Sequence, residues 1–217
     1  MCISFCPTKN LKQQGWTDMA KLYFKFGAMG SSKTANALMT KFNYEEKGKK
    51  VWLIKPAIDT RDNVADKVMI GSRIGLKAEA QAIRSVANLY EIFSVYQGPL
   101  KMHYDAIICD ECQFLTAAQV DELKAITDEF DVPVLCFGLR SDFRTMLFEG
   151  SRRLFEIADS ISEIKSICAC GKKAIVNARI RDGKIVSEGP LVELGGNEKY
   201  EAMCWHCYQQ LKKERCI

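Results

Sequence analysis

The sequence predicts a layered α/β protein, in which a mainly parallel sheet carries helices on both faces and is followed by a small cysteine-bearing β unit. Three observations indicate this fold class. Short apolar runs alternate with helical patterns over residues 22–139, a loop of small residues joins the first run to the first helical pattern, and two close cysteine pairs enclose a hairpin pattern after residue 161. Strands that alternate with helices form parallel crossover units, so the early patterns belong to one sheet.

Length and charge narrow the possible classes of protein. A chain of 217 residues has room for one substantial domain and a small second unit. Its net charge of +4 gives no strong indication of a nucleic-acid partner. The longest apolar runs, such as residues 132–139, are too short to cross a bilayer, and residues 1–18 lack the apolar core of a signal peptide. We expect a cytoplasmic protein with no membrane partner.

The chain divides into three parts on these patterns. Residues 1–18 are polar and aperiodic and form an N-terminal extension that is set aside in reasoning about the fold. Residues 19–162 form the main domain, and residues 163–217 form the small one.

The loop after the apolar run at residues 22–26 predicts a phosphate-binding site. It consists of Gly27, Ala28, Met29, Gly30, Ser31, Ser32, Lys33 and Thr34. Small residues let backbone N–H groups turn onto phosphate oxygens, and the next helix presents its positive dipole end to the same anion. Lys33 would reach the terminal phosphates and the Thr34 hydroxyl would ligate Mg²⁺. The alternative is a plain strand-to-helix turn that contains a surface lysine.

Ser32 departs from the usual phosphate-loop motif, which has glycine directly before the lysine. A Cβ therefore stands where the backbone favours unusual φ and ψ angles. The surrounding pattern still suits the motif, because residues 22–26 alternate as a strand does and apolar residues repeat at helical spacing over residues 35–42.

A second nucleotide signature lies where an apolar run at residues 104–109 ends in Asp110 and Glu111. An acid at the carboxyl end of a parallel strand beside a phosphate loop holds Mg²⁺ through water, which suits Asp110, and Glu111 would act on the group that attacks or receives the phosphate. Acids that cap a helix are the alternative. Cys109 and Cys112 also form a Cys-x-x-Cys pattern, but the acids fit phosphate chemistry better and no thioredoxin-like pattern surrounds them.

The other patterns of the main domain predict further strands and helices. We expect buried strands over residues 51–54 and 132–139 and helices over residues 88–96 and 117–130. Cys109 and Cys136 lie in apolar runs and are expected in the core. In contrast, residues 57–77 have little pattern, and such a long stretch inside a compact domain is usually functional or mobile.

An aromatic residue follows the strand expected over residues 132–139, at the sheet edge where open α/β proteins bind ligands. Phe143 stands between Arg140 and Arg144. The ring would stack on a base while the cations face phosphate. A core phenylalanine flanked by surface arginines is equally compatible with the pattern.

The small unit has the sequence of a structural zinc site. Cys168, Cys170, Cys204 and Cys207 form two close pairs, and between them a hairpin is expected over residues 174–186 with its turn at residues 182–183. Each pair would supply two thiolates to one tetrahedral ion. A hairpin and a loop bury too little apolar surface alone, so the metal would supply the missing stability.

These motifs together resemble the type II thymidine kinases, a cytosolic family with a RecA-like P-loop domain and a zinc-held lasso. The resemblance runs from about residue 21 to residue 208. Its most distinctive pieces lie at residues 110–114, 138–144, 148–151, 168–174 and 195–200.

The resemblance implies transfer of the γ-phosphoryl group of ATP to the 5′-hydroxyl of thymidine, which gives dTMP. Asp110 would assist Mg²⁺, Glu111 would be the general base, and Phe143 would stack on thymine. It further implies a homotetramer and feedback inhibition by dTTP. The residues implied to bind ATP continue from the acids into Cys112 and Gln113. The residues implied to bind the base, largely through their main chain, are Leu191, Val192, Glu193, Leu194 and Gly195, with Tyr200 completing the pocket.

The sequence departs from the family pattern at two positions. Ser32 replaces the glycine of the phosphate loop, and Cys112 stands where the family usually has alanine. Two other classes remain as alternatives: an ATP-dependent nucleic-acid motor, for which we find no basic or aromatic stripe, and a non-catalytic nucleotide sensor in which Ser32 marks lost turnover.

Overall fold

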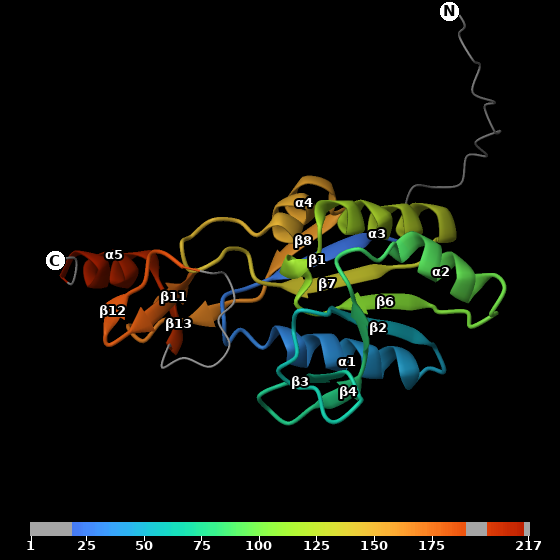
Figure 1. Ribbon diagram of the computed structural model, residues 1–217, viewed down its shortest axis with the longest axis horizontal. Coiled ribbons are helices and arrows are strands. Elements are labelled where there is room, and N and C mark those ends of the chain that lie inside the picture. The colour runs from blue at the N-terminus through green and yellow to red at the C-terminus, as the bar shows by residue number, and fades with distance from the viewer. Residues whose placement is uncertain (1–18, 190–198, 215–217) are drawn as a thin grey trace, which may run out of the picture.

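The computed structural model describes residues 19–189 and 199–214, so the predicted extension over residues 1–18 lies outside the described residues. Its centre is a six-stranded sheet in the order β5-β2-β6-β7-β1-β8, with every neighbouring pair parallel (Figure 1). The strands are β1 (Leu22–Phe26), β2 (Val51–Pro56), β5 (Gln81–Ile83), β6 (Ala106–Cys109), β7 (Val134–Gly138) and β8 (Ser160–Glu163). The predicted parallel sheet is confirmed.

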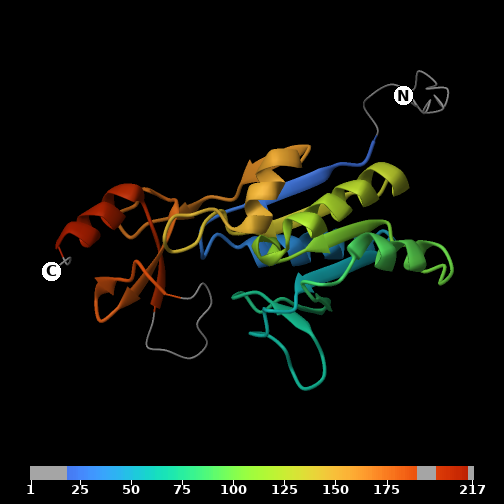
Figure 2. The same cartoon turned by 45° about the horizontal axis from the view of Figure 1, so that its top comes forward.

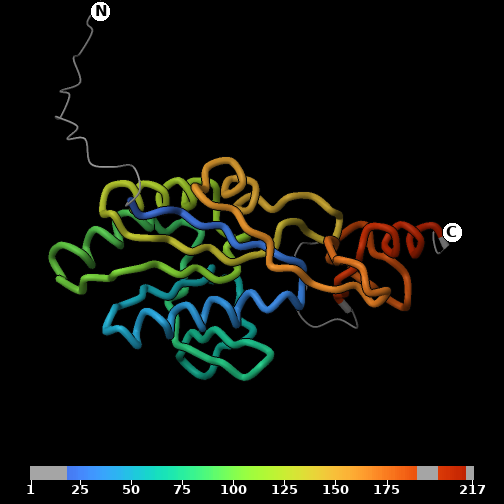
Figure 3. The backbone as a smooth tube through the Cα atoms, turned by 180° about the vertical axis from the view of Figure 1, so that it is seen from behind, coloured from blue at the N-terminus to red at the C-terminus, as the bar shows by residue number. Residues whose placement is uncertain are grey.

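Helices cover both faces of this sheet (Figure 3). One face carries α1 (Lys33–Glu45) together with the short hairpin of β3 (Met69–Gly71) and β4 (Lys77–Glu79). The opposite face carries α2 (Leu89–Gln97), α3 (Ala117–Phe130) and α4 (Glu149–Ile157), and the 3-10 turn η1 (Cys112–Phe114) leads into α3. Over residues 19–189 and 199–214, no helix combines the length and the apolar character needed to cross a membrane.

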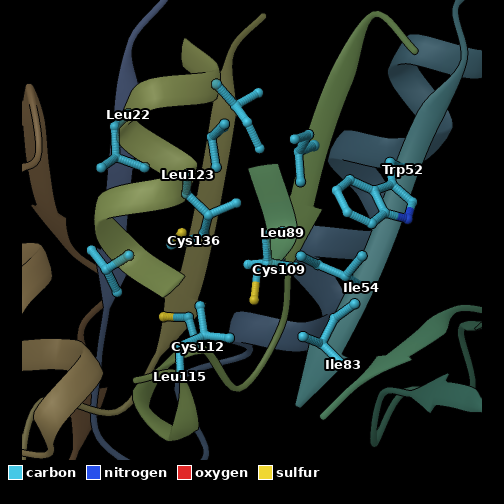
Figure 4. Close-up of a cluster of buried hydrophobic side chains, with 14 of the residues drawn as sticks. Leu22, Trp52, Ile54, Ile83, Leu89, Cys109, Cys112, Leu115, Leu123 and Cys136 are labelled. Atoms are coloured by element: carbon cyan, nitrogen blue, oxygen red, sulfur yellow. The ribbon is translucent and has the colours of Figure 1, made fainter. Parts of the chain in front are cut away.

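Successive side chains of the buried strands point to opposite faces of the sheet and contribute to two separate hydrophobic cores. Along β2, Trp52 and Ile54 pack with α2 and α3, whereas Val51 and Leu53 pack with α1 on the other side. Figure 4 shows the first of these clusters, with Leu123 of α3 among its members. The continuous apolar runs of the sequence follow from this burial on both faces.

Strands β5 and β8 are additions that the sequence patterns did not predict. Both lie at edges of the sheet. They are short, and β8 carries Ser160, Ser162 and Glu163 around a single isoleucine. Because an edge strand needs little apolar surface, its hydrophobic pattern is weak.

The small unit follows β8 and lies at one end of the sheet (Figure 2). Its elements are β9 (Ser166–Ile167), β10 (Lys173–Ala174), β11 (Val176–Arg181), β12 (Lys184–Ile185), β13 (Lys199–Met203) and α5 (Trp205–Glu214). Strands β11 and β12 form the expected hairpin, with φ of 49° at Asp182 and 72° at Gly183 in its turn. Ala174 differs from the prediction, because it pairs with β9 rather than continuing β11. The domain boundary at residue 162 stays a prediction.

Candidate active site

The phosphate-loop residues lie between β1 and α1, at the carboxyl edge of the sheet. α1 begins at Lys33, and Ser32 takes the N-cap position with left-handed angles, φ 61° and ψ 28°. Lys33 folds back over the loop, where its Nζ donates to the Ala28 carbonyl at 2.9 Å and to Ser31 Oγ at 3.3 Å. Burial lowers the pKa of Lys33, and the negative charges of Glu111 and Asp110 oppose that shift. The lysine therefore sits at the loop and near both acids.

Asp110 and Glu111 lie at the carboxyl end of β6, near this lysine. Asp110 is 4% exposed. Burial and the charge of Glu111 raise the pKa of Asp110 to about 7, while a hydrogen bond from Thr34 acts in the opposite direction. A buried carboxylate beside a threonine hydroxyl is a donor set that suits a hard divalent cation.

The carboxylate of Glu111 is held at both oxygens. Arg61 Nη2 donates to its Oε1 at 2.6 Å, and Gln113 Nε2 donates to its Oε2. The other end of the Gln113 amide accepts from the Leu139 amide at 2.9 Å. Glu111 itself has left-handed backbone angles, φ 52° and ψ 34°. Such strained residues gather at functional sites, where surrounding bonds fix the side chain's direction.

Arg61 is positioned by a chain of charges that starts inside the protein. Lys55 is fully buried, and its Nζ donates to the Met69 carbonyl at 2.7 Å and lies 3.6 Å from Asp59 Oδ2. Asp59 Oδ1 accepts from Arg61 Nε at 2.7 Å. Burial alone would lower the pKa of Arg61, but its bonds to Asp59 and the charge of Glu111 raise it. The guanidinium is therefore a permanent cation.

A cleft of about 340 Å³ joins these groups. Its lining consists of residues of the phosphate loop, the acids Asp110 and Glu111, and a third group made of Asp59, Arg61 and residues 71–74. This volume falls in the range of small-molecule sites, roughly 300–1,000 Å³. Residues 57–77, which the sequence left without a pattern, thus supply part of the lining of the cleft.

The four predicted zinc ligands converge. The sulfur atoms of Cys168, Cys170, Cys204 and Cys207 all lie within 4.8 Å of one another. Cys170 Sγ and Cys204 Sγ are 3.6 Å apart, close to the separation of about 3.8 Å expected for tetrahedral zinc with bonds of about 2.3 Å. The Cys207 amide donates to Cys204 Sγ, so this pair forms a tight turn around its sulfurs. The cluster fits one structural zinc ion.

Comparison with known proteins gives one family. The family model described as thymidine kinase matches residues 20–208. The thymidine kinase of Legionella pneumophila (strain Philadelphia 1) is 45% identical over 197 residues, which cover 90% of this chain and 92% of that protein. The thymidine kinase of Enterobacteria phage T4 is 42% identical over 90% of this chain and 99% of its own, and that of Lactiplantibacillus plantarum is 45% identical over 88% and 96%. This chain belongs to the thymidine kinase family.

The three cysteines of the main domain that lie in or next to the sheet strands are core residues. Cys109, Cys112 and Cys136 are fully buried in the first apolar cluster, as Figure 4 shows. Burial raises the pKa of Cys112 well above its ordinary value, so the thiol stays protonated at neutral pH. The prediction that Cys109 and Cys136 are core residues is confirmed.

The aromatic residues expected on the thymidine side lie together beside β11. Phe143 is 2% exposed, and the Arg179 guanidinium carbon lies 5.0 Å from its ring centroid and 6.0 Å from that of Tyr200. The flanking arginines do not project from the ring as free cations: Arg140 donates to the Ile175 carbonyl, and Arg144 pairs with Asp142. Stacking of a base on Phe143 thus requires its neighbours to move aside.

Residues 191–195 of the predicted lasso lie outside the described residues.

The sequence analysis did not predict two residues of this site. Arg61 lies in residues 57–77, where the sequence has little pattern, and Asn177, which contacts the phosphate loop, lies within the hairpin expected over residues 174–186. Asn177 alternates with apolar residues in β11 as Arg179 and Arg181 do, so the strand pattern gives no signal that singles it out.

Proposed function

We propose that the cleft between Lys33 and Arg61 is where this thymidine kinase transfers the γ-phosphoryl group of ATP to the 5′-hydroxyl of thymidine. The observation that carries the proposal is that one carboxylate, Glu111, faces the same cleft as the phosphate loop and is held at both oxygens. Phosphoryl transfer requires little covalent work from the protein, so aligned donor and acceptor groups and local positive charge account for most of the catalysis.

The phosphate loop would bind the triphosphate. Residues 27–32 would offer backbone N–H groups, and the N-terminus of α1 would face the same anion. Lys33 Nζ now donates to the Ala28 carbonyl and Ser31 Oγ, and we propose that it turns from these groups to the terminal phosphates. Its position near Asp110 and Glu111 supports this role.

Thr34 and Asp110 would hold Mg²⁺. When bound, the ion would supply positive charge that offsets the negative charge of the phosphates. Asp110 supports the assignment because burial makes its negative charge unfavourable, as its raised pKa indicates. A bound cation would stabilise that charge in place of the proton. Thr34 supports it because its side chain already lies within hydrogen-bond distance of Asp110.

Glu111 would accept the proton of the 5′-hydroxyl as that oxygen attacks. Gln113 and Arg61 keep its two oxygens in fixed directions. We assign to Arg61 a second task, which is to face the charge that develops on the transferred group, because its guanidinium lines the cleft beside Glu111. A fixed cation in this position favours the transition state over the ground state.

For the nucleoside we propose the residues that the family resemblance implies. Phe143 and Tyr200 would form aromatic walls around thymine, and the main chain of residues 191–195 would bind its polar edge. The shared contact of Phe143 and Tyr200 with Arg179 supports one common pocket. A homotetramer, inhibition by dTTP, a cytoplasmic location and the absence of a nucleic-acid partner also remain proposals from the resemblance and the charge of the chain.

The experiment that tests the function is steady-state phosphorylation with Mg-ATP by the purified protein. Thymidine is compared with deoxycytidine, and single-stranded DNA is added as a separate arm. We expect dTMP from thymidine, little product from deoxycytidine and no stimulation by DNA. Tight ATP binding without turnover of any nucleoside would instead favour a nucleotide sensor, and DNA-stimulated hydrolysis would favour a motor.

A further inference from the structure

Both backbone polar groups of Met29, in the middle of the phosphate loop, are bound by the small unit. The Met29 amide donates to Asn177 Oδ1 at 2.7 Å, and the Met29 carbonyl accepts from Ser166 Oγ at 3.3 Å. The preceding residue, Ala28, packs in the apolar cluster of the small unit with Cys168 and Cys204. The phosphate loop is therefore seated on the zinc-bearing unit.

Asn177 connects this loop to a second segment of the site. Its side chain is buried, with 3% exposed, and its Nδ2 donates to the Ser141 carbonyl at 3.1 Å. Ser141 stands two residues before Phe143. One amide thus joins the loop expected to bind ATP to the segment expected to bind the nucleoside.

The loop needs such support because of Ser32. A left-handed conformation is unfavourable for a residue with a Cβ, and glycine avoids this cost. Ser32 adopts φ 61° with no side-chain cap on α1. Bonds from outside the loop can offset the cost, and the bonds to Met29, three residues earlier, come from outside.

We propose that Asn177 is a positioning residue that keeps the phosphate loop in its ATP-binding conformation by holding Met29. The bond is carried by β11, which pairs with β13 along Val176–Ile180, and β13 leads directly to Cys204. The small unit that carries the four cysteines is therefore bonded to the phosphate loop through Asn177, beside the weaker bond from Ser166. This inference rests on the proposed phosphate-binding role of residues 27–34.

The test is a double-mutant cycle between Asn177→Leu and Ser32→Gly, with the KM for ATP measured at saturating thymidine. Asn177→Leu leaves the Met29 amide without its partner, and a buried unpaired group of this kind corresponds to about a 5- to 100-fold rise in that KM. Ser32→Gly should have the smaller effect on the KM in the native chain, where the loop is already held. In the Asn177→Leu chain it should lower the KM at least threefold, since it removes the cost of the left-handed conformation.

Zinc content and a remote control separate positioning from general damage. Asn88 Oδ1 accepts from the Glu91 amide at the start of α2, so Asn88→Leu also removes an asparagine bond to a backbone amide. Asn88→Leu should leave the KM for ATP within twofold, and both variants should keep their zinc. Ser32→Gly should not lower the KM for ATP of the Asn88→Leu chain more than it does in the native chain.

Two results would overturn the proposal: a KM for ATP in zinc-loaded Asn177→Leu within twofold of native, or an equal effect of Ser32→Gly in both backgrounds. If Asn177→Leu does not fold, Ser166→Ala carries the test, because it removes the bond to the Met29 carbonyl from a partly exposed site. We expect about a 2- to 10-fold rise in KM from Ser166→Ala, and an unchanged KM overturns the proposal. Lys33→Met, run in parallel, tests the phosphate site itself: undiminished ATP binding there would refute the site, a result distinct from failure of the Asn177 proposal.

Discussion

Arg61 Nη2 donates to Glu111 Oε1 at 2.6 Å, so the proposed general base is paired with a cation that lines the same cleft. The glutamate is fixed from the other side by Gln113, and the arginine from behind by Asp59. In the proposed reaction the two would act at its two ends: the base would remove a proton from the acceptor, and the cation would meet the charge of the transferred phosphoryl group.

Arg61→Ala should lower kcat by about 10²- to 10³-fold, the usual effect of removing one preorganised donor from a developing charge. Arg61→Lys should recover only part of this loss, because an ammonium group cannot bond both Asp59 and Glu111 in the geometry of a guanidinium. Steady-state kinetics with thymidine checks both. Arg153→Ala is the control, since Arg153 pairs with Asp121 and Glu156 away from the cleft. A kcat for Arg61→Ala within threefold of native would contradict the role of Arg61 in stabilising the charge on the transferred group.

Glu111→Gln should lower kcat by about 10²- to 10⁴-fold, the contribution of a well-placed general base. The fold should survive, because glutamine has the same shape and its amide oxygen still accepts a hydrogen bond. Thermal unfolding and zinc content are measured beside turnover to verify this. Glu79→Gln, which alters an exposed pair with Lys67, should behave as native. Unchanged turnover in Glu111→Gln would mean that another group accepts the proton.

The parts of the site that lie in continuous sequence were predictable. The order of strand, small-residue loop, Lys33 and helix is local, and so is the run that ends in Asp110 and Glu111. Periodicity and motif spacing record such local relations directly. The convergence of the cysteine pairs was predictable for a different reason, since thiols at that spacing have few other roles in a chain of this kind.

The parts that depend on sheet order were not predictable from pattern. Arg61 meets Glu111 across 50 residues because β2 lies beside β6, and the stretch around Arg61 has no periodicity of its own. Asn177 meets Met29 across 148 residues, through packing of the small unit on the loop. The edge strands β5 and β8 were not predicted, because a partly exposed strand does not require a continuous run of apolar residues.

Cys204→Ser should abolish tight zinc binding and unfold the small unit, because a structural site that loses one of four thiolates loses much of its folding free energy. Activity should fall with zinc content, since the phosphate loop is seated on that unit. Metal analysis of the purified protein checks the first effect. Cys136→Ser alters a buried cysteine outside the cluster and should retain zinc even if it lowers stability. Full zinc content in Cys204→Ser would show that another residue completes the site.

Asp110→Asn should stabilise the chain at pH 8 when Mg²⁺ and nucleotide are left out. In the folded chain the pKa of Asp110 is raised from 3.8 to about 7 by burial and by Glu111. The folded state therefore binds this proton more tightly than the unfolded state, and its stability falls as pH rises between about 4 and 7. Asparagine cannot ionise, so the variant avoids this loss, which is at most about 4 kcal/mol at 1.36 kcal/mol per pKa unit.

Urea unfolding at pH 4 and pH 8 measures the effect. The advantage of Asp110→Asn should be present at pH 8 and should shrink towards pH 4. Asp66→Asn, which alters an exposed carboxyl, is measured beside it as the control. Adding Mg²⁺ at pH 8 should stabilise the native chain and leave Asp110→Asn nearly unchanged, because the cation binds the ionised carboxylate. A variant less stable than the native chain at pH 8 would contradict the burial of an ionised carboxylate at this position.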